Sequence, residues 1–205
     1  MKASHRAQSI ENVALRRIYS LGRGSVFTPA RFLDKGGRAA VDKALSRLTH
    51  AKIIRRLGRG VYDYPKTHPK LGLLAPSADN IAAALIYPLR GPLQPSGAYA
   101  ANLIGLSEQV PMKAVFLTTG TPRRVRLGRR EIILKRTTPR QMATAGRISG
   151  LVIQALRHLG RQRFDTCGLS ALKQRLTTED KRQLLKDAPL ATGWVAGYLR
   201  ELGRE

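Results

Sequence analysis

Cysteine and histidine are scarce in this 205-residue chain, and their scarcity excludes several kinds of site. The single cysteine, Cys167, cannot form an internal disulfide or supply a site made of several cysteines. The four histidines, His5, His50, His68 and His158, lie too far apart for the usual spacing of metal ligands. We therefore expect neither a metal site nor a cofactor.

Long apolar stretches are missing as well. A transmembrane helix would need a run of about 18 apolar residues, and none occurs. Residues 1–10 also lack the apolar core of a signal peptide. We expect a cytoplasmic protein that has no membrane partner.

Acidic residues are few, which bears on catalysis. The 13 Asp and Glu residues are too dispersed to suggest a general acid and base, or a cluster that holds catalytic metals. The motifs of phosphate-binding loops, dinucleotide-binding loops, nucleophile elbows and zinc proteases are absent from the sequence. The sequence therefore predicts that the chain is not an enzyme.

Basic residues dominate instead. The chain has 37 Lys and Arg residues, 26 of them Arg, and a formal net charge of +24. Residues 1–76 hold 16 cations and 4 anions, and residues 77–205 hold 21 and 9, so both halves are basic. Such charge indicates a polyanionic partner, and the planar arginine fork suits phosphates and the guanine edge. We expect a nucleic acid as the partner.

The proline pattern predicts two domains. Three prolines fall between Tyr64 and Ser77, where they remove backbone donors and oppose helix formation. We therefore expect a linker at residues 66–76 between domains at 1–65 and 77–205.

Local patterns within residues 1–65 predict a winged helix-turn-helix. Apolar residues at helical spacing indicate a helix from Ser4 to Leu21, followed by an extended piece at residues 25–27. Thr28 and Pro29 are typical of a helix start, and this second helix should end near Asp34. A third helix is expected at 38–51, and strands at 52–57 and 61–64 around Gly58-Arg59-Gly60 would form the wing.

The third helix has two faces of opposite character. Its apolar stripe should pack inward, while small, polar and cationic residues share the other side, which enters the major groove in a helix-turn-helix. The wing should position phosphates or reach the minor groove. The predicted DNA-binding residues are Arg38, Lys43, Ser46, Arg47, His50, Arg55, Arg56 and Arg59. The alternative is a domain that makes only protein contacts.

Residues 77–205 predict a helix-rich α+β domain with a small antiparallel sheet. Helices are expected at 78–89 and 96–106, then a meander of strands at 113–119, 123–127 and 131–136, then helices at 148–159, 168–175, 178–185 and 194–202. Residues 120–163 hold 12 cations and one anion, Glu131. The candidate surface for nucleic acid or a partner consists of Arg123, Arg124, Arg126, Arg129, Arg130, Lys135 and Arg136.

Several segments resemble one known family. Residues 40–48 (AVDKALSRL) and 54–62 (IRRLGRGVY) resemble the N-terminal winged helix of AbiEi-type antitoxins from bacterial type IV toxin–antitoxin systems. Residues 95–106 (PSGAYAANLIGL), 109–111 (QVP) and 116–120 (FLTTG) resemble the start of the antitoxin domain in that family. The resemblance covers most of residues 10–137 and thins toward the C-terminus.

The resemblance implies a two-part protein. The first domain would repress its own operon at inverted repeats in double-stranded DNA, as a monomer or a dimer on the DNA. The second would oppose a nucleotidyltransferase-like toxin, with which it need not form a stable complex. Two other interpretations stay open, which are a stand-alone winged-helix transcriptional regulator and an RNA-binding accessory protein. The low aromatic content, 5%, speaks against a platform on which single-stranded bases stack.

Overall fold

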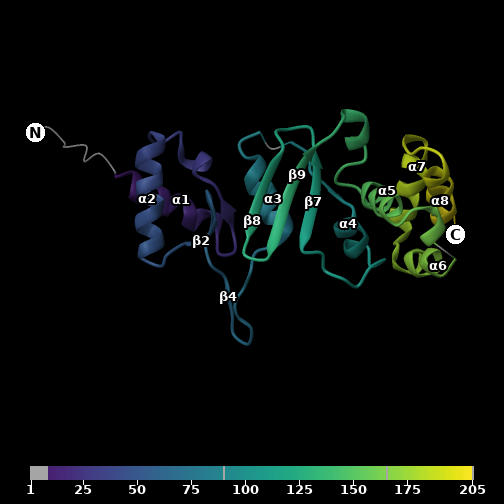
Figure 1. Cartoon of the computed structure of the whole chain (residues 1–205), viewed down its shortest axis with the longest axis horizontal. Coiled ribbons are helices and arrows are strands. Elements are labelled where there is room, and N and C mark those ends of the chain that lie inside the picture. The colour runs from purple at the N-terminus through teal and green to yellow at the C-terminus, as the bar shows by residue number, and fades with distance from the viewer. Residues whose placement is uncertain (1–8, 90, 165, 205) are drawn as a thin grey trace, which may run out of the picture. The chain divides into compact units, whose positions relative to one another are not determined.

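The computed structural model describes residues 9–89, 91–164 and 166–204, except for the side chain of Cys167 (Figure 1). Helices and small sheets are mixed along the chain, so the predicted α+β class is confirmed. The chain divides into two units, residues 1–90 and 91–205. Among the described residues, no helix combines the length and the apolar character needed to cross a membrane.

Two helices form the frame of the first unit. Helix α1 (Ile10–Leu21) begins at Ser9, whose hydroxyl accepts a hydrogen bond from the Asn12 amide, and ends at Gly22. The part of the expected helix before Ser9 lies outside the described residues. Helix α2 (Arg38–His50) packs against α1, and the two enclose a core with Phe27 and Phe32.

A three-stranded antiparallel sheet completes this core. Strand β1 (Val26–Phe27) pairs with β3 (Val61–Asp63), which also pairs with β2 (Arg55–Gly58), so that β3 is central. The helix expected at 28–34 is a short 3-10 helix, η1 (Pro29–Phe32). β2 starts later than expected because Lys52, at φ 57°, turns the chain out of α2.

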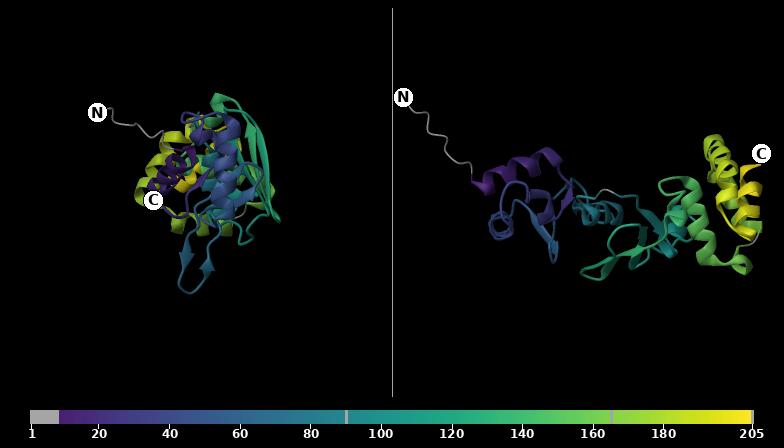
Figure 2. Two further views of the ribbon diagram at one scale, coloured as in Figure 1. Left: turned by 90° about the vertical axis from the view of Figure 1, so that its left-hand side faces the viewer. Right: turned by 90° about the horizontal axis from the view of Figure 1, so that it is seen from above.

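The first unit extends beyond the expected linker. Residues 66–76 contain a small exposed hairpin, β4 (Thr67–His68) with β5 (Gly72–Leu73), which projects from this unit (Figure 2). Helix α3 (Ala78–Ile86), expected in the second domain, packs against β1 and β3. The division between the units therefore falls after residue 90 and not at 66–76, because α3 buries its apolar face on the first sheet.

The second unit contains a four-stranded sheet in the order β6-β7-β9-β8. Its strands are β6 (Gln94–Ser96), β7 (Lys113–Thr118), β8 (Arg123–Leu127) and β9 (Arg130–Arg136). Two of the three pairings are antiparallel, but β7 pairs with β9 in parallel. The predicted antiparallel meander, in which β8 would lie between β7 and β9, was therefore wrong. Arginine-rich β8 occupies an edge, where charged residues are tolerated, while β9 buries Ile132 and Leu134 at the centre.

Helices make up the rest of the second unit. They are α4 (Ala98–Leu103), α5 (Ile148–Leu159), α6 (Thr166–Arg175), α7 (Thr178–Asp187) and α8 (Trp194–Gly203), with short 3-10 turns η2 (Pro139–Met142), η3 (Arg161–Arg163) and η4 (Ala188–Leu190). Their apolar faces meet in one core that includes Leu156, Leu172, Leu184, Leu199 and Leu202. The four C-terminal helices confirm the predicted periodicity, and α5 matches its expected range.

A buried carboxylate joins two of these helices. Asp187, 2% exposed, lies at the end of α7 and accepts hydrogen bonds from Arg147 Nη1 and Gln183 Nε2, both at 2.8 Å. It also accepts a short hydrogen bond from the Ser149 hydroxyl. Arg147 and Ser149 flank the start of α5, where the helix dipole favours negative charge. Asp187 therefore connects the end of α7 to the start of α5.

An ion pair fixes the turn that precedes α2. Arg17 of α1 donates to both carboxylate oxygens of Asp34, at 2.7 and 2.9 Å, and to the carbonyl of Arg31 at 2.5 Å. These hydrogen bonds from Arg17 lower the pKa of Asp34 to about 2. A carboxylate whose pKa is depressed by folding stabilises the fold above its unfolded pKa, and this stabilisation is lost as the pH falls through the folded value.

We expect the Arg17→Met variant to return the pKa of Asp34 toward the reference value of about 3.9. A carboxyl-detected NMR titration measures this pKa directly. In the wild type the contribution of the pair to stability should be complete above about pH 4 and should disappear toward pH 2. Arg16→Met is the matched control, because the exposed Arg16 forms no ion pair within the described residues. An equal rise of the pKa in both variants would contradict the assignment to Arg17.

Candidate nucleic-acid interface

The outer face of α2 carries the residues that the sequence predicted for contact with DNA. The inner face buries Val41, Ala44, Leu45 and Leu48. The remaining positions leave a polar and cationic side exposed to solvent. Its exposed residues include Arg38, Lys43, Ser46, Arg47 and His50. Lys43, Ser46 and His50 share this outer stripe with Arg47 beside it, as the helical spacing predicted. Arg38 is exposed at the first residue of the helix, about half a turn around the axis from Arg47.

Two of the five have acidic partners. Arg38 Nε lies 2.8 Å from Asp42 Oδ2 on the same helix, and Arg47 Nη1 lies 3.2 Å from Glu11 Oε2 of α1. Exposed pairs of this kind contribute only about 0–1 kcal/mol, so a phosphate can replace the acid at little cost. In the part of the chain that the structure describes, Lys43 has no ion-pair partner.

The hairpin between β2 and β3 presents an arginine at its tip. Arg59 is exposed in the turn between the strands, and Gly60 next to it takes a φ of 69°, which glycine adopts easily. Arg56 is exposed on β2, opposite Tyr62 of β3. Both guanidinium groups are therefore available to an external anion.

Arg55 has a different position from the one expected for a phosphate contact. Its Nε and Nη2 donate to the two carboxylate oxygens of Asp63, at 3.0 and 2.5 Å, and Nη2 also donates to the Leu74 carbonyl at 3.0 Å. The side chain of Asp63 is only 2% exposed. The hydrogen bonds to Asp63 raise the pKa of Arg55 above its ordinary value. Arg55 thus holds the hairpin together from within.

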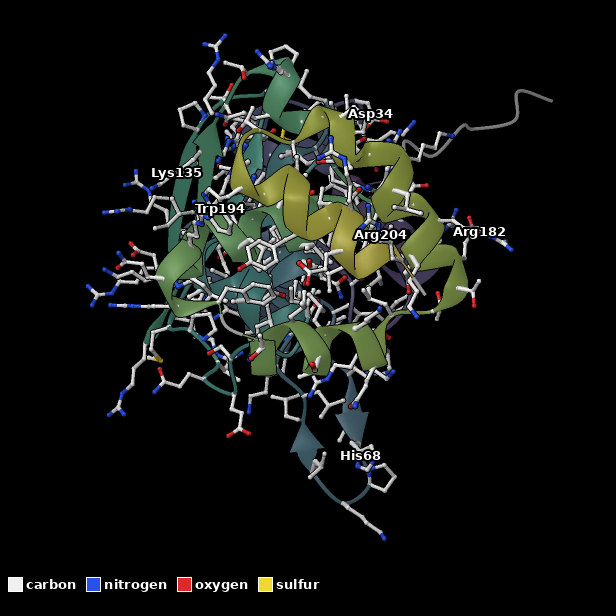
Figure 3. All side chains as sticks on the ribbon, turned by 90° about the vertical axis from the view of Figure 1, so that its right-hand side faces the viewer. Asp34, His68, Lys135, Arg182, Trp194 and Arg204 are labelled. Atoms are coloured by element: carbon white, nitrogen blue, oxygen red, sulfur yellow. The ribbon has the colours of Figure 1, made fainter. Side chains whose placement is uncertain are left out.

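The sheet of the second unit carries the second predicted surface. All seven of its predicted residues are exposed, namely Arg123, Arg124, Arg126, Arg129, Arg130, Lys135 and Arg136. Figure 3 shows Lys135 at the outside of this sheet, among side chains that end in nitrogen. Arg129 lies in the β8–β9 turn, beside Gly128 at φ 61°. Within this group, Arg124 pairs with Glu131 at 3.2 Å.

Strand pairing adds a cation that the sequence analysis missed. The parallel register places Lys113 of β7 opposite Glu131 of β9, and Arg126 of β8 opposite the same residue. Because paired residues share a face, exposed Lys113 lies on the face that carries Arg126. A shallow hollow of about 480 Å³, lined in part by Arg123, Arg124, Lys135 and Arg136, lies at one end of this sheet.

No group of three or more His, Cys, Asp or Glu side chains within the described residues is placed to hold a metal ion. The side chain of Cys167 lies outside the described residues.

The comparisons with known proteins give one result. A model of a family of unknown function, DUF6088, matches residues 13–184. The chain belongs to this family. No curated protein and no solved structure gave a significant match. The DUF6088 match runs from α1 into α7, so the family region includes residues of both units and both basic surfaces.

In this DUF6088 protein, Arg55→Met should lower the free energy of unfolding of the first unit by about 3 kcal/mol, because it leaves the buried Asp63 carboxylate unpaired. Urea unfolding followed by far-UV circular dichroism measures the loss. Fluorescence of Trp194, the single tryptophan, reports the second unit and should keep its midpoint. Arg56→Met is the control and should change stability by less than about 0.5 kcal/mol. Equal losses in the two variants would rule out the structural role of Arg55.

Proposed function

We propose that this protein binds double-stranded DNA through a winged helix-turn-helix formed by residues 9–64. Helix α2 is the recognition helix, and the β2–β3 hairpin is the wing. The second helix of the motif is reduced to the single turn η1. Arg38, Lys43, Ser46, Arg47 and His50 face the major groove, while Arg56 and Arg59 contact the phosphate backbone.

One observation carries this proposal. The exposed side of α2 combines cations with small polar residues, and the same unit presents an arginine at the tip of its hairpin. Phosphate contacts supply affinity and position, whereas side chains on a helix in the groove supply sequence preference. The order of the elements, with β3 between β1 and β2, agrees with a winged helix. The net charge of +24 favours a polyanion as the ligand.

We propose further that the protein is an antitoxin that represses its own operon and opposes a nucleotidyltransferase-like toxin. The support for this step is the resemblance to AbiEi-type antitoxins, which is carried by residues 40–48, 54–62, 95–106, 109–111 and 116–120. The second unit then carries the neutralising activity, and its basic sheet holds nucleic acid or protects an RNA substrate of the toxin.

DNA binding is tested by fluorescence anisotropy with the duplex immediately upstream of the gene and a shuffled duplex of equal length, at two salt concentrations. The upstream duplex should bind tighter by about 10³-fold, as is common for specific binders. Arg59→Gln should weaken binding to both duplexes and reduce the salt slope by about one unit for the lost phosphate contact. Lys43→Gln or Ser46→Ala should erode the preference for the upstream duplex.

Arg182→Gln is the matched control, because it removes one exposed cation from α7 in the other unit. Its affinity and salt slope should equal those of the wild type. If the Lys43 and Ser46 variants behave like the Arg59 variant and lose affinity equally on both duplexes, α2 does not read the groove. If the two duplexes bind alike and weaken alike with salt, the charge acts only as a phosphate clamp.

The antitoxin role is tested by co-expression with the product of the adjacent gene. We expect the neighbour alone to arrest growth and this protein to restore it. Rescue should persist in the Arg59→Gln variant, because neutralisation is assigned to the second unit. If the neighbour is not a nucleotidyltransferase-like protein and no rescue occurs, a stand-alone transcriptional regulator becomes the better interpretation.

A second candidate function is RNA binding by the sheet of the second unit. The exposed arginines of β8 and the β8–β9 turn favour it. In the same assay, this candidate predicts that structured RNA binds more tightly than duplex DNA. The preference should be lost in Arg126→Gln and kept in Arg59→Gln, and this result would favour RNA binding over the first proposal.

A further inference from the structure

A cavity of about 480 Å³ lies within the first unit, apart from the outer face of α2 and the Arg59 turn. One wall consists of β1 and the residues that precede it. The opposite wall is α3, the helix that the sequence placed in another domain. The cavity exists because α3 packs beside β1, and the DNA-binding proposal gives it no role.

Two of the residues that line this cavity carry buried hydroxyl groups without a hydrogen-bond partner in the described part of the chain. Ser25 Oγ and Thr28 Oγ1 are buried, and neither forms a hydrogen bond within the described part of the chain. Thr28 is only 6% exposed. A buried hydroxyl without a partner costs about 1–3 kcal/mol, so such groups are rare unless a ligand or a water satisfies them. These two hydroxyls point to a ligand with acceptor atoms.

Three cations line the same cavity, and no acidic residue does. The Arg31 guanidinium carbon lies 4.7 Å from the centre of the Tyr87 ring, and that of Arg23 lies 4.8 Å from the centre of the Tyr64 ring. The side chain of Lys66 lies alongside Gly24. Among the described residues, none of these three cations forms an ion pair with a carboxylate. The cavity is therefore a positive site with hydroxyl donors.

We propose that this cavity binds a small organic phosphate. A phosphate presents several acceptor oxygens, which suit two hydroxyl donors together with a guanidinium and an ammonium group. The remaining wall is apolar and includes Val26, Phe27 and Ala84, and the volume lies in the range of about 300–1,000 Å³ that is typical of small-molecule sites. The phosphate group binds at Thr28, Arg31 and Lys66, and the organic part lies against the apolar wall. This site is independent of the DNA-binding proposal.

The test is a titration of the ¹⁵N-labelled full chain with inorganic phosphate, phenyl phosphate and adenosine 5′-monophosphate, followed by NMR at constant ionic strength. The two organic phosphates should shift the backbone amides of Ser25, Thr28 and Arg31. Inorganic phosphate should shift the same amides at higher concentration, and adenosine, which lacks the anion, should not. If none of the three phosphates shifts these amides at millimolar concentration, the proposal fails.

Variants separate a built site from diffuse attraction. Lys66→Gln and Thr28→Val should each weaken binding of phenyl phosphate by about tenfold, the usual effect of losing one hydrogen bond to a charged group. Lys70→Gln, which removes a neighbouring exposed lysine that does not line the cavity, should leave binding unchanged. Equal weakening by Lys66→Gln and Lys70→Gln would overturn the proposal. Shifts of these amides by duplex DNA alone would replace it with a backbone contact.

Discussion

The ion pair between Arg55 and Asp63 is the interaction on which the first unit depends. Asp63 lies on the central strand β3, opposite Val26 of β1 and opposite Arg55 of β2. Arg55 also reaches the Leu74 carbonyl, so one guanidinium connects the sheet to the chain that follows the β4–β5 hairpin. The pair therefore joins the two strands that flank the Arg59 turn and ties them to the segment that leads into α3.

Local features of the fold could be predicted from the sequence, and long-range pairings could not. The ranges of α5 and β8 agree with the predicted ones because helical periodicity and short alternating runs bounded by glycine are local patterns. The parallel pairing of β7 with β9 depends on which strands take the two central positions of the sheet, and this is decided by long-range packing. The attachment of α3 to the first sheet depends on the packing of Ile81 and Leu85.

The same distinction applies to the candidate sites. The outward face of α2 could be predicted because side chains on a helix return to the same face every 3.6 residues, so the apolar positions indicate which side is exposed. The structural role of Arg55 was missed because its acidic partner lies on the next strand. The cavity was missed because it combines Thr28, Lys66 and residues of α3, which only tertiary structure brings together.

The place of α3 decides how the chain can be dissected. A fragment that ends at residue 65 or 76 would lose α3, the helix that packs on β1. The complementary C-terminal fragment would expose Ile81 and Leu85 of α3 to water. Truncations at the proline-rich segment would therefore yield two aggregation-prone pieces whose lack of activity says nothing about either unit. Boundaries drawn after residue 90 keep each apolar face with its own partner.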